Sequence, residues 1–304
     1  MNAYTTIATD VRGALERRSA VVALETSIIS HGMPFPENLA TARASEAIVR
    51  GLGVVPATIG VLGGRIRIGL SDSEMERFAQ KDSILKLSIA DLAYAVAGGK
   101  DGATTVAATM VCAHLAGIRV VATGGIGGVH LDAETTLDVS ADLTTLGRTP
   151  ITVVCSGAKA ILDIERTLEA LETLGVSVVC YRTDEFPAFW SRSSGVRAPI
   201  RCDSVEEIAH VIHTKRQLGL TSAVLVANPV GTDDEIPRGE LVAHVDAATR
   251  EAHRQGISGK ALTPFLLDWI SSSTGGRSLA TNIALVKGNA RLAALLALAL
   301  SEER

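Results

Sequence analysis

The stretch from Val121 to Asp163 reads VATGGIGGVHLDAETTLDVSADLTTLGRTPITVVCSGAKAILD. Two short apolar runs without charge, 120–123 and 151–155, begin and nearly end it, and each leads into a turn that contains glycine. Uncharged runs rich in Val and Ile are typical of parallel strands that helices cover on both faces. The turns that follow such strands lie at the carboxyl edge of the sheet, where open α/β sheets bind their ligands. The stretch therefore predicts an α/β fold and the position of its site.

The alternation of strand and helix signals continues on both sides of this stretch. Apolar runs predict further strands at 20–24, 58–62, 65–68, 176–181 and 222–227. Helical spacing of apolar residues is found at 39–51, 72–80, 104–116, 161–174, 205–218, 238–255 and 278–300. Gly63-Gly64 separates two of the strands as a hairpin turn does, and we expect 25–38 to be irregular.

The order of these elements predicts one domain. No Ser/Pro-rich linker and no change of composition divides residues 1–304, so we expect a single three-layer α/β/α domain with a mixed, mostly parallel sheet. Segment 184–199, DEFPAFWSRSSGVRAP, carries most of the aromatic residues of its neighbourhood. We expect it to be a loop over the active site.

Composition excludes several classes of function. The net charge is -4 and no window concentrates Lys and Arg, so we expect no nucleic-acid partner. The four cysteines are widely spaced without a CxxC pair, which is typical of small apolar residues in a reducing compartment. The N-terminus lacks the apolar core of a signal peptide, and the Ala/Leu run at 293–300 is too short to span a bilayer. These features predict a cytoplasmic protein with no membrane contact.

Two glycine-containing turns are candidates for binding a phosphate or a sugar. Gly102-Ala103-Thr104-Thr105 precedes a helix, whose free N–H groups and dipole suit an anion, and the hydroxyls of Thr104 and Thr105 add donors. An ordinary helix cap is the alternative. Lys86 and Lys100 lie nearby in the sequence and would supply countercharge. The second turn, 124–128, is no dinucleotide fingerprint, because His130-Leu131-Asp132 interrupts the helix that should follow.

Asp138, Ser140 and Asp142 recur at every second position. In an extended segment they share one face and offer oxygen ligands to a hard cation. The glycine and distal glutamate of an EF-hand are missing, and a solvated loop edge or a helix cap is the alternative interpretation. His130, close by, would be an outer hydrogen-bond donor or a structural histidine.

Lys159 and Glu25 follow predicted strands and are the candidates for chemistry. A partly desolvated amine at the carboxyl edge is a nucleophile able to form an imine with a sugar aldehyde; a salt-bridging lysine is the alternative. An apolar setting would raise the pKa of Glu25 towards general-acid use. His31 and Glu37 share the loop after Glu25. The Asn282 amide suits hydrogen bonds to a flat heterocycle, unless it only caps a neighbouring helix.

The chain resembles the pseudouridine-5'-phosphate glycosidases, also called indigoidine synthase A-like proteins. The motifs that carry the resemblance occur in the right order over nearly the whole chain: ALETSIISHGMP at 23–34, then 102–110, 123–130, 138–143, 183–189, 259–267 and 274–290. The resemblance implies an α/β/α fold, a homotrimer, a divalent metal (Mn²⁺) and reversible C-glycosidic chemistry on ribose 5-phosphate.

Roles carried over from the family motifs follow the same order. The resemblance makes Lys159 the imine-forming lysine, Glu25 the general acid that opens the ribose ring and Asp142 the metal ligand with water. It makes Asn282 the amide that binds the base. Substrate contacts are expected from Lys86, Thr104, Thr105, Thr123, His130 and Ser140.

Three positions depart from the family pattern. Ile89-Ala90 replaces two arginines, Leu131-Asp132 replaces Arg-Gly, and Gly288 replaces the first residue of an Asn-Asn pair. Fewer basic contacts indicate a larger, more apolar pocket for the carbon partner. In this the chain resembles the C-ribosylating members of the family, and that resemblance implies a C-glycosynthase that joins ribose 5-phosphate to an aromatic polyketide. The alternatives are a pseudouridine-5'-phosphate glycosidase and a catalytically inactive sugar-phosphate-binding protein.

Overall fold

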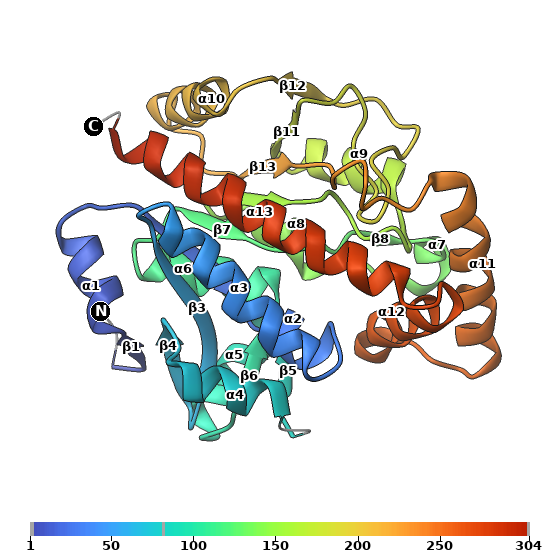
Figure 1. The fold of residues 1–304 in the computed structure, drawn as a ribbon, viewed down its shortest axis with the longest axis horizontal. Helices are drawn as coiled ribbons and strands as arrows, with labels where there is room; N and C mark the ends of the chain where they lie inside the picture. Colours follow the sequence, from blue (N-terminus) through green and yellow to red (C-terminus); the bar gives the residue numbers. More distant parts are fainter. Residues whose placement is uncertain (1–2, 81–82, 303–304) are drawn as a thin grey trace.

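A mixed, mostly parallel sheet of 11 strands runs through the computed structural model, which describes residues 3–80 and 83–302 (Figure 1). The central order is β1-β4-β3-β2-β7-β9-β13-β11-β12, and β6 joins β3 and β5 beside this path. Among the described strands of this sheet, only the β3–β4 and β3–β6 pairs are antiparallel. The strands of the sheet are β1 (Thr5–Ile7), β2 (Val21–Glu25), β3 (Val55–Leu62), β4 (Arg65–Ile68), β5 (Leu85–Leu87), β6 (Gly102–Thr104), β7 (Val120–Ala122), β9 (Thr152–Cys155), β11 (Ser177–Tyr181), β12 (Ile200–Cys202) and β13 (Val224–Ala227).

Side chains of the central strands alternate between two apolar cores, one on each face of the sheet. In β2, Val21 and Ala23 join the larger core, whereas Val22 and Leu24 join the other. The same alternation in β7, β9, β11 and β13 follows from the period of two along a strand. Because both faces are covered, the strands have no polar face, and the predicted α/β/α fold with a mixed, mostly parallel sheet is confirmed.

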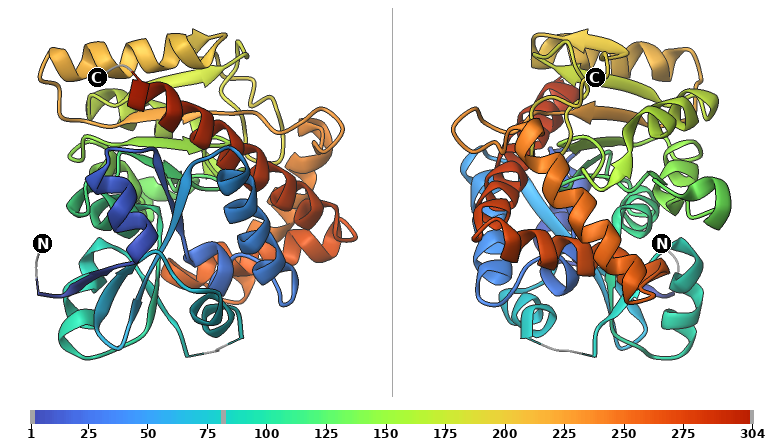
Figure 2. Two further views of the ribbon diagram at one scale, coloured as in Figure 1. Left: turned by 60° about the vertical axis from the view of Figure 1, so that its left-hand side comes forward. Right: turned by 90° about the vertical axis from the view of Figure 1, so that its right-hand side faces the viewer.

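Helices form the two outer layers (Figure 2). On one face α13 crosses the sheet and contacts β2, β7 and β9, with α3 and α10 beside it. On the other face α6 packs against β2, β3 and β7, and α9 against β11. The helices are α1 (Thr9–Glu16), α2 (Ser27–His31), α3 (Glu37–Gly51), α4 (Asp72–Gln80), α5 (Ile89–Ala97), α6 (Val106–Leu115), α7 (Ala133–Thr136), α8 (Ala141–Leu146), α9 (Ile164–Thr173), α10 (Val205–Gln217), α11 (Arg238–Arg254), α12 (Leu262–Ser273) and α13 (Arg277–Glu302).

Two local expectations were wrong. Segment 25–38 is not irregular throughout, because Ser27–His31 forms the short helix α2. The Gly102–Thr104 part of the expected turn is strand β6, which pairs with β5 in parallel and with β3 in antiparallel orientation. Three small residues give no local strand signal, so neighbours distant in sequence decide this conformation. A small antiparallel pair of β8 (Val129–His130) and β10 (Leu162–Asp163) was also unforeseen.

Helix α13 is 26 residues long, longer than the Ala/Leu run considered in the sequence. By length and composition alone it passes as a membrane-spanning candidate, yet 56% of its apolar window is buried in the protein. This burial is the behaviour of a core helix in a globular domain. The four cysteines are free and buried, as expected for small apolar core residues.

Candidate active site

The carboxyl ends of β2, β7 and β9, adjacent in the sheet, bring the candidate catalytic residues together. Glu25 is the last residue of β2, Thr123 follows β7, and Lys159 follows the turn after β9. Parallel strands end at the same edge, so residues 134 positions apart along the chain meet there. Glu25 and Lys159 line the same two cavities.

Three neighbouring cavities that share lining residues lie at this edge. The Asp142 cavity, about 140 Å³, is lined by Glu25, Ser27, Lys86, Ser88, Thr105, Val106, Gly127, His130, Ser140, Asp142, Lys159, Leu162 and Thr263. The junction cavity, about 40 Å³, shares five of these residues and adds Gly124, Gly125, Phe189 and Asn282 among others. The Met33 cavity, about 310 Å³, shares His31, Gly32, Leu267 and Asn282 with the junction cavity.

The Glu25 carboxyl is buried and held by two hydroxyl groups. Ser27 Oγ donates a hydrogen bond to Oε2, and Thr123 Oγ1 donates one to Oε1. Burial raises the pKa of Glu25, while the two hydroxyls and the charge of Lys159 lower it to a smaller extent and Asp142 opposes them. Because burial is the largest effect, the carboxyl retains a proton above the usual pKa of a glutamate.

A tight turn fixes the backbone of Lys159. Ile126 N donates to Gly157 O (3.1 Å), and Lys159 N donates to Ile126 O (3.1 Å), so the turns after β7 and β9 are bonded together. Gly157 has φ +82°, and a Cβ there would lie 2.0 Å from the carbonyl oxygen of Pro187. Only glycine fits this position. The half-buried Lys159 side chain then lines the cavities beside Glu25.

Asp142 is buried and lines the Asp142 cavity together with Glu25 and Lys159. Its Oδ1 accepts from Ala107 N (2.9 Å) in the first turn of α6, and its Oδ2 accepts from Gly127 N (2.8 Å). A Cβ on Gly127 would lie 2.3 Å from Ser140 Oγ, so glycine permits this close approach. The backbone thus presents Asp142 to the cavity in one orientation.

The geometry of Asp142 fits a metal site of one protein ligand. A carboxylate has about four lone-pair positions, and two backbone bonds leave others available towards the cavity. Within residues 3–80 and 83–302 no group of three or more His, Cys, Asp or Glu is arranged to hold a metal. A cation here would therefore keep water as its remaining ligands, which suits Mg²⁺-like ions better than Zn²⁺.

Most residues expected to bind substrate line the Asp142 cavity: Lys86, Thr105, His130 and Ser140. Thr105 Oγ1 is buried without a hydrogen-bond partner in the described chain. It stands at the N-terminus of α6, where the helix dipole favours an anion. His130 Nε2 lies 3.9 Å from Asp138 Oδ2, and Ser140 Oγ caps α8 by accepting from Asp142 N.

Two residues that the sequence predicts to bind substrate, Thr104 and Thr123, use their hydroxyls in hydrogen bonds within the protein. Thr104 is fully buried, its hydroxyl donates to Ile59 O (2.7 Å), and it lines none of the three cavities. The hydroxyl of Thr123 donates its hydrogen bond to Glu25. Lys100 is exposed and lies over the Tyr94 ring, away from the cavities, so it supplies no countercharge there.

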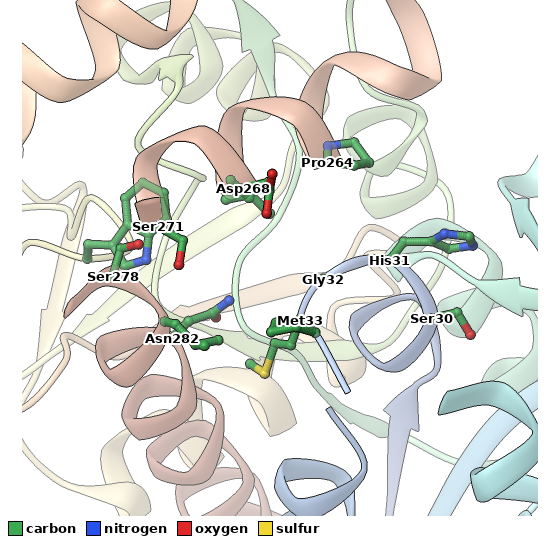
Figure 3. Close-up of a pocket in the computed structure, with 13 residues that line it drawn as sticks. Ser30, His31, Gly32, Met33, Pro264, Asp268, Ser271, Ser278 and Asn282 are labelled. Carbon is green, nitrogen blue, oxygen red and sulfur yellow. The ribbon is translucent and has the colours of Figure 1, made fainter. Parts of the chain in front are cut away.

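The Met33 cavity has an unusual polar wall (Figure 3). Asn282 Oδ1, Ser278 Oγ, Trp190 Nε1 and His31 Nε2 are buried without a hydrogen-bond partner among the described residues. Ser278 and Asn282 are four residues apart on α13, hence on one face of the helix. Burial lowers the pKa of His31 and the charge of Lys86 lowers it further, so the ring favours the neutral form. Unpaired buried polar groups are uncommon in folded proteins, and these four line one cavity in which water or a polar ligand can reach them.

Segment 184–199 is a firmly packed part of the wall rather than an open loop. Phe186, Phe189 and Trp190 are buried in the apolar core. Phe189 N donates to Ser156 O (2.9 Å), and Ile236 N donates to Trp190 O (2.9 Å). Phe189 lines the junction cavity and Trp190 the Met33 cavity, which agrees with the expected proximity to the site.

The sequence analysis gave no role to several residues that the site contains. Ser27 and Thr263 line both cavities around Lys159, and Asn289 bonds to the ends of three strands. Each lies inside a matched motif, but serine, threonine and asparagine are too common for spacing to single them out. Leu131, in contrast, is exposed, Asp132 faces His253 (3.6 Å), and neither lines the three cavities.

Comparison with known proteins agrees with this arrangement. A family profile described as "Indigoidine synthase A like protein" matches residues 10–299. A pseudouridine-5'-phosphate glycosidase of Methylobacterium nodulans is 59% identical over 297 residues, covering 98% of this chain and 88% of the relative. One of Solibacter usitatus is also 59% identical, covering 95% of this chain and 96% of the relative.

Solved structures show the same fold. The prealnumycin C-glycosynthase AlnA, crystallised with ribulose 5-phosphate, is 39% identical with a TM-score of 0.92 over 100% of both chains. An indigoidine synthase A-like protein of Thermotoga maritima is 37% identical with a TM-score of 0.89, covering 98% of this chain and 96% of its own. Profile, relatives and fold agree over nearly the whole chain, which therefore belongs to the indigoidine synthase A-like family.

Proposed function

We propose that this protein cleaves pseudouridine 5'-phosphate reversibly to uracil and ribose 5-phosphate. The observation that carries the proposal is the meeting of an amine, Lys159, with a buried carboxyl of raised pKa, Glu25, in one small cavity. A C-glycosidic bond has no heteroatom leaving group, so protonation of an exocyclic atom alone does not break it. A nucleophile at C1' together with an acid for the ring oxygen meets this need.

The relatives favour this reaction over the C-glycosynthase that the sequence analysis put first. Curated relatives named pseudouridine-5'-phosphate glycosidase reach 59% identity, against 39% for the prealnumycin C-glycosynthase. The Leu131-Asp132 departure, read as a sign of an apolar partner, lies outside the cavities. The unpaired polar atoms of the Met33 cavity also suit uracil, which offers carbonyl oxygens and ring N–H groups.

The reaction proceeds in three steps. The lone pair of Lys159 Nζ bonds to C1' as the bond from C1' to the ring oxygen breaks. Glu25 gives its proton to that oxygen, and its carboxylate then takes a proton from the nitrogen. Glu25 passes this proton to the base carbon as the bond from that carbon to C1' breaks, and the lone pair of the nitrogen forms the C1'=N iminium. Water adds to the iminium and gives its proton back to Glu25, which releases the aldehyde of ribose 5-phosphate and returns Lys159 as an amine. The steps reverse for synthesis.

The phosphate and the metal belong to the Asp142 cavity in this proposal. Lys86, Thr105, His130 and Ser140 supply a charge and donors for the sugar phosphate. Asp142 would hold Mn²⁺ through water-rich coordination, and such a cation supplies charge that orients and polarises oxygen groups of the substrate. Asn282 faces the base from α13.

Trapping of the imine tests the mechanism. The protein is incubated with ribose 5-phosphate and borohydride, and the adduct is located by mass spectrometry. We expect it on Lys159, and none on a Lys159→Arg variant. An adduct on Lys86 instead would show that Lys86, and not Lys159, is the nucleophile. Ribose 5-phosphate binding without any adduct would favour the inactive sugar-phosphate-binding protein.

The carbon partner is tested in the direction of synthesis. The protein is supplied with ribose 5-phosphate and either uracil or a naphthoquinone-type acceptor, and C-ribosylated products are measured. We expect a product from uracil alone. A product only from the aromatic acceptor would restore the C-glycosynthase and exclude the glycosidase as the main activity. A homotrimer in the cytoplasm, without nucleic-acid or membrane partners, stays our prediction for the assembly.

A further inference from the structure

Asn289, fully buried in α13, bonds to the carboxyl ends of three neighbouring strands. Its Nδ2 donates to Thr123 O (2.8 Å) and Gly124 O (3.2 Å), which follow β7. Its Oδ1 accepts from Asn228 Nδ2 (3.0 Å), which follows β13. Ser156 Oγ, after β9, lies 3.1 Å from Nδ2 and 3.3 Å from Oδ1. One amide therefore joins β7, β9 and β13.

The chemistry at this position requires an amide. The two carbonyl oxygens only accept, and Asn228 Nδ2 only donates, so the residue between them must both donate and accept. An apolar side chain would leave these buried groups unpaired, and a carboxylate would face two carbonyl oxygens. The orientation of the amide follows from the same partners.

These bonds lead directly to both reacting groups. Thr123, whose carbonyl Asn289 holds, donates its hydroxyl to Glu25. Ser156 N donates to Gly124 O (2.8 Å), and Lys159 follows Ser156 by three residues. Asn289 itself lines none of the three cavities.

We propose that Asn289 is a positioning residue of the active site. It fixes the turn after β7, so that Thr123 orients the Glu25 carboxyl, and the turn after β9, which carries Lys159. The inference rests on the proposed function, since it takes Glu25 and Lys159 as the reacting groups. Asn289 touches no substrate atom and acts through its neighbours.

Steady-state kinetics on pseudouridine 5'-phosphate test this role. Displacement of a reacting group by about 1 Å costs on the order of 100-fold in rate. We expect Asn289→Ala to lower kcat by about tenfold or more. KM should stay within about twofold, because Lys86, Thr105 and Ser140 bind the phosphate elsewhere.

Asn228→Ala is the matched control. It removes the bond to Oδ1 but keeps both bonds from Nδ2 to the turn after β7. It should lower the melting temperature as Asn289→Ala does, while kcat stays within about twofold. If both variants lose kcat equally at equal thermal stability, Asn289 only supports the fold. Where Asn289→Ala fails to fold, the isosteric Asn289→Asp keeps the volume and should still lose kcat.

A double-mutant cycle tests the route through Thr123. Thr123→Val keeps the shape but removes the hydroxyl that bonds Glu25. Residues that act through one another are not additive, so Thr123→Val with Asn289→Ala should lose less kcat than the product of the two single losses. A full multiplicative loss would overturn the proposed route.

Failure of this inference is distinguishable from failure of the proposed function. If the unaltered protein forms no borohydride-trapped adduct on Lys159, the proposed function fails together with the inference. If the adduct forms and the Asn289 variants keep full kcat, the proposed function stands and the positioning role of Asn289 is wrong.

Discussion

Glu25 illustrates how a single residue acquires its chemistry from its surroundings. Burial is the largest influence on its carboxyl and raises its pKa. The hydroxyls of Ser27 and Thr123 and the charge of Lys159 lower the pKa to a smaller extent. Burial therefore turns an ordinary strand-end glutamate into an acid that keeps its proton to a higher pH than an exposed glutamate does.

Glu25→Gln should remove the general acid without changing the size of the side chain. We expect kcat to fall by about 10²- to 10⁴-fold. In the unaltered protein the acid is active only while protonated, so kcat should fall as pH rises through the raised pKa of Glu25. A pH profile of kcat checks this, and the alkaline fall due to Glu25 should vanish in the variant. Glu37→Gln, the same change in a residue that lines no cavity of the site, is the control.

Asp142→Asn should weaken the binding of Mn²⁺. Glu25 and Asp142 are the carboxylates among the described residues that line the Asp142 cavity, and the change makes the second of them neutral. The amide nitrogen of the new side chain would also face one of the two backbone N–H donors that now bond to Asp142. We expect the Kd for Mn²⁺, measured by calorimetry, to rise by at least about 10- to 100-fold, which is the order of loss when residues around a metal are changed. Asp138→Asn, in the same run but outside the cavity, should bind as the unaltered protein does. Unchanged Mn²⁺ affinity in Asp142→Asn would contradict the metal site.

Trp190→Phe should separate stability from recognition. The Trp190 Nε1 donor is buried without a partner among the described residues, so its removal relieves about 1–3 kcal/mol. This gain offsets part of the packing lost with the smaller ring, so the melting temperature of the free protein should change little. If the donor serves uracil, KM for uracil in synthesis should rise by about 2- to 13-fold, the loss of one hydrogen bond. Trapping of ribose 5-phosphate on Lys159 should not change. If the variant and the unaltered protein have the same KM for uracil, Trp190 takes no part in recognition of the base.

At the scale of elements, the turns after strands decide the site. The turn after β9 meets segment 184–199 so closely that Gly157 lies against Pro187. The same turn bonds to Ile126 in the turn after β7. Lys159 is therefore placed by two turns and a segment that come from different parts of the chain.

Gly157→Ala tests this placement against a matched glycine. Both Gly157 and Gly219 have positive φ, but a Cβ on Gly219 meets nothing within 4 Å. Gly219→Ala should cost only the backbone strain, about 1 kcal/mol. Gly157→Ala adds a clash with backbone, so we expect a larger loss of unfolding free energy and a loss of kcat. Chemical denaturation and kinetics measure both, and equal effects of the two changes would disprove the role of the close contact.

At the scale of the whole molecule, α13 connects the layers to the site. Its apolar face fills the core between α3 and α10, while Ser278, Asn282 and Asn289 reach the carboxyl edge of the sheet. A helix with the composition of a membrane span thus serves as the central core helix and as one wall of the cavities.

The family resemblance predicts that three copies assemble. Sedimentation equilibrium should give three times the chain mass of 31.7 kDa over a wide concentration range. A mass of 31.7 kDa at micromolar concentration would exclude a stable homotrimer.

The sequence by itself determined the class of fold and the edge at which the site lies. Charge-free apolar runs such as 151–155 are typical of strands covered on both faces, and residues that follow parallel strands share one edge. Lys159 and Glu25 could be found in this way. The tertiary structure alone decided that β2, β7 and β9 are neighbours, that the Thr123 hydroxyl donates to Glu25, and that Asn289 donates to a carbonyl 166 residues away. Local periodicity encodes which face of an element is buried, but strand order and long-range hydrogen bonds depend on the packing of the whole chain.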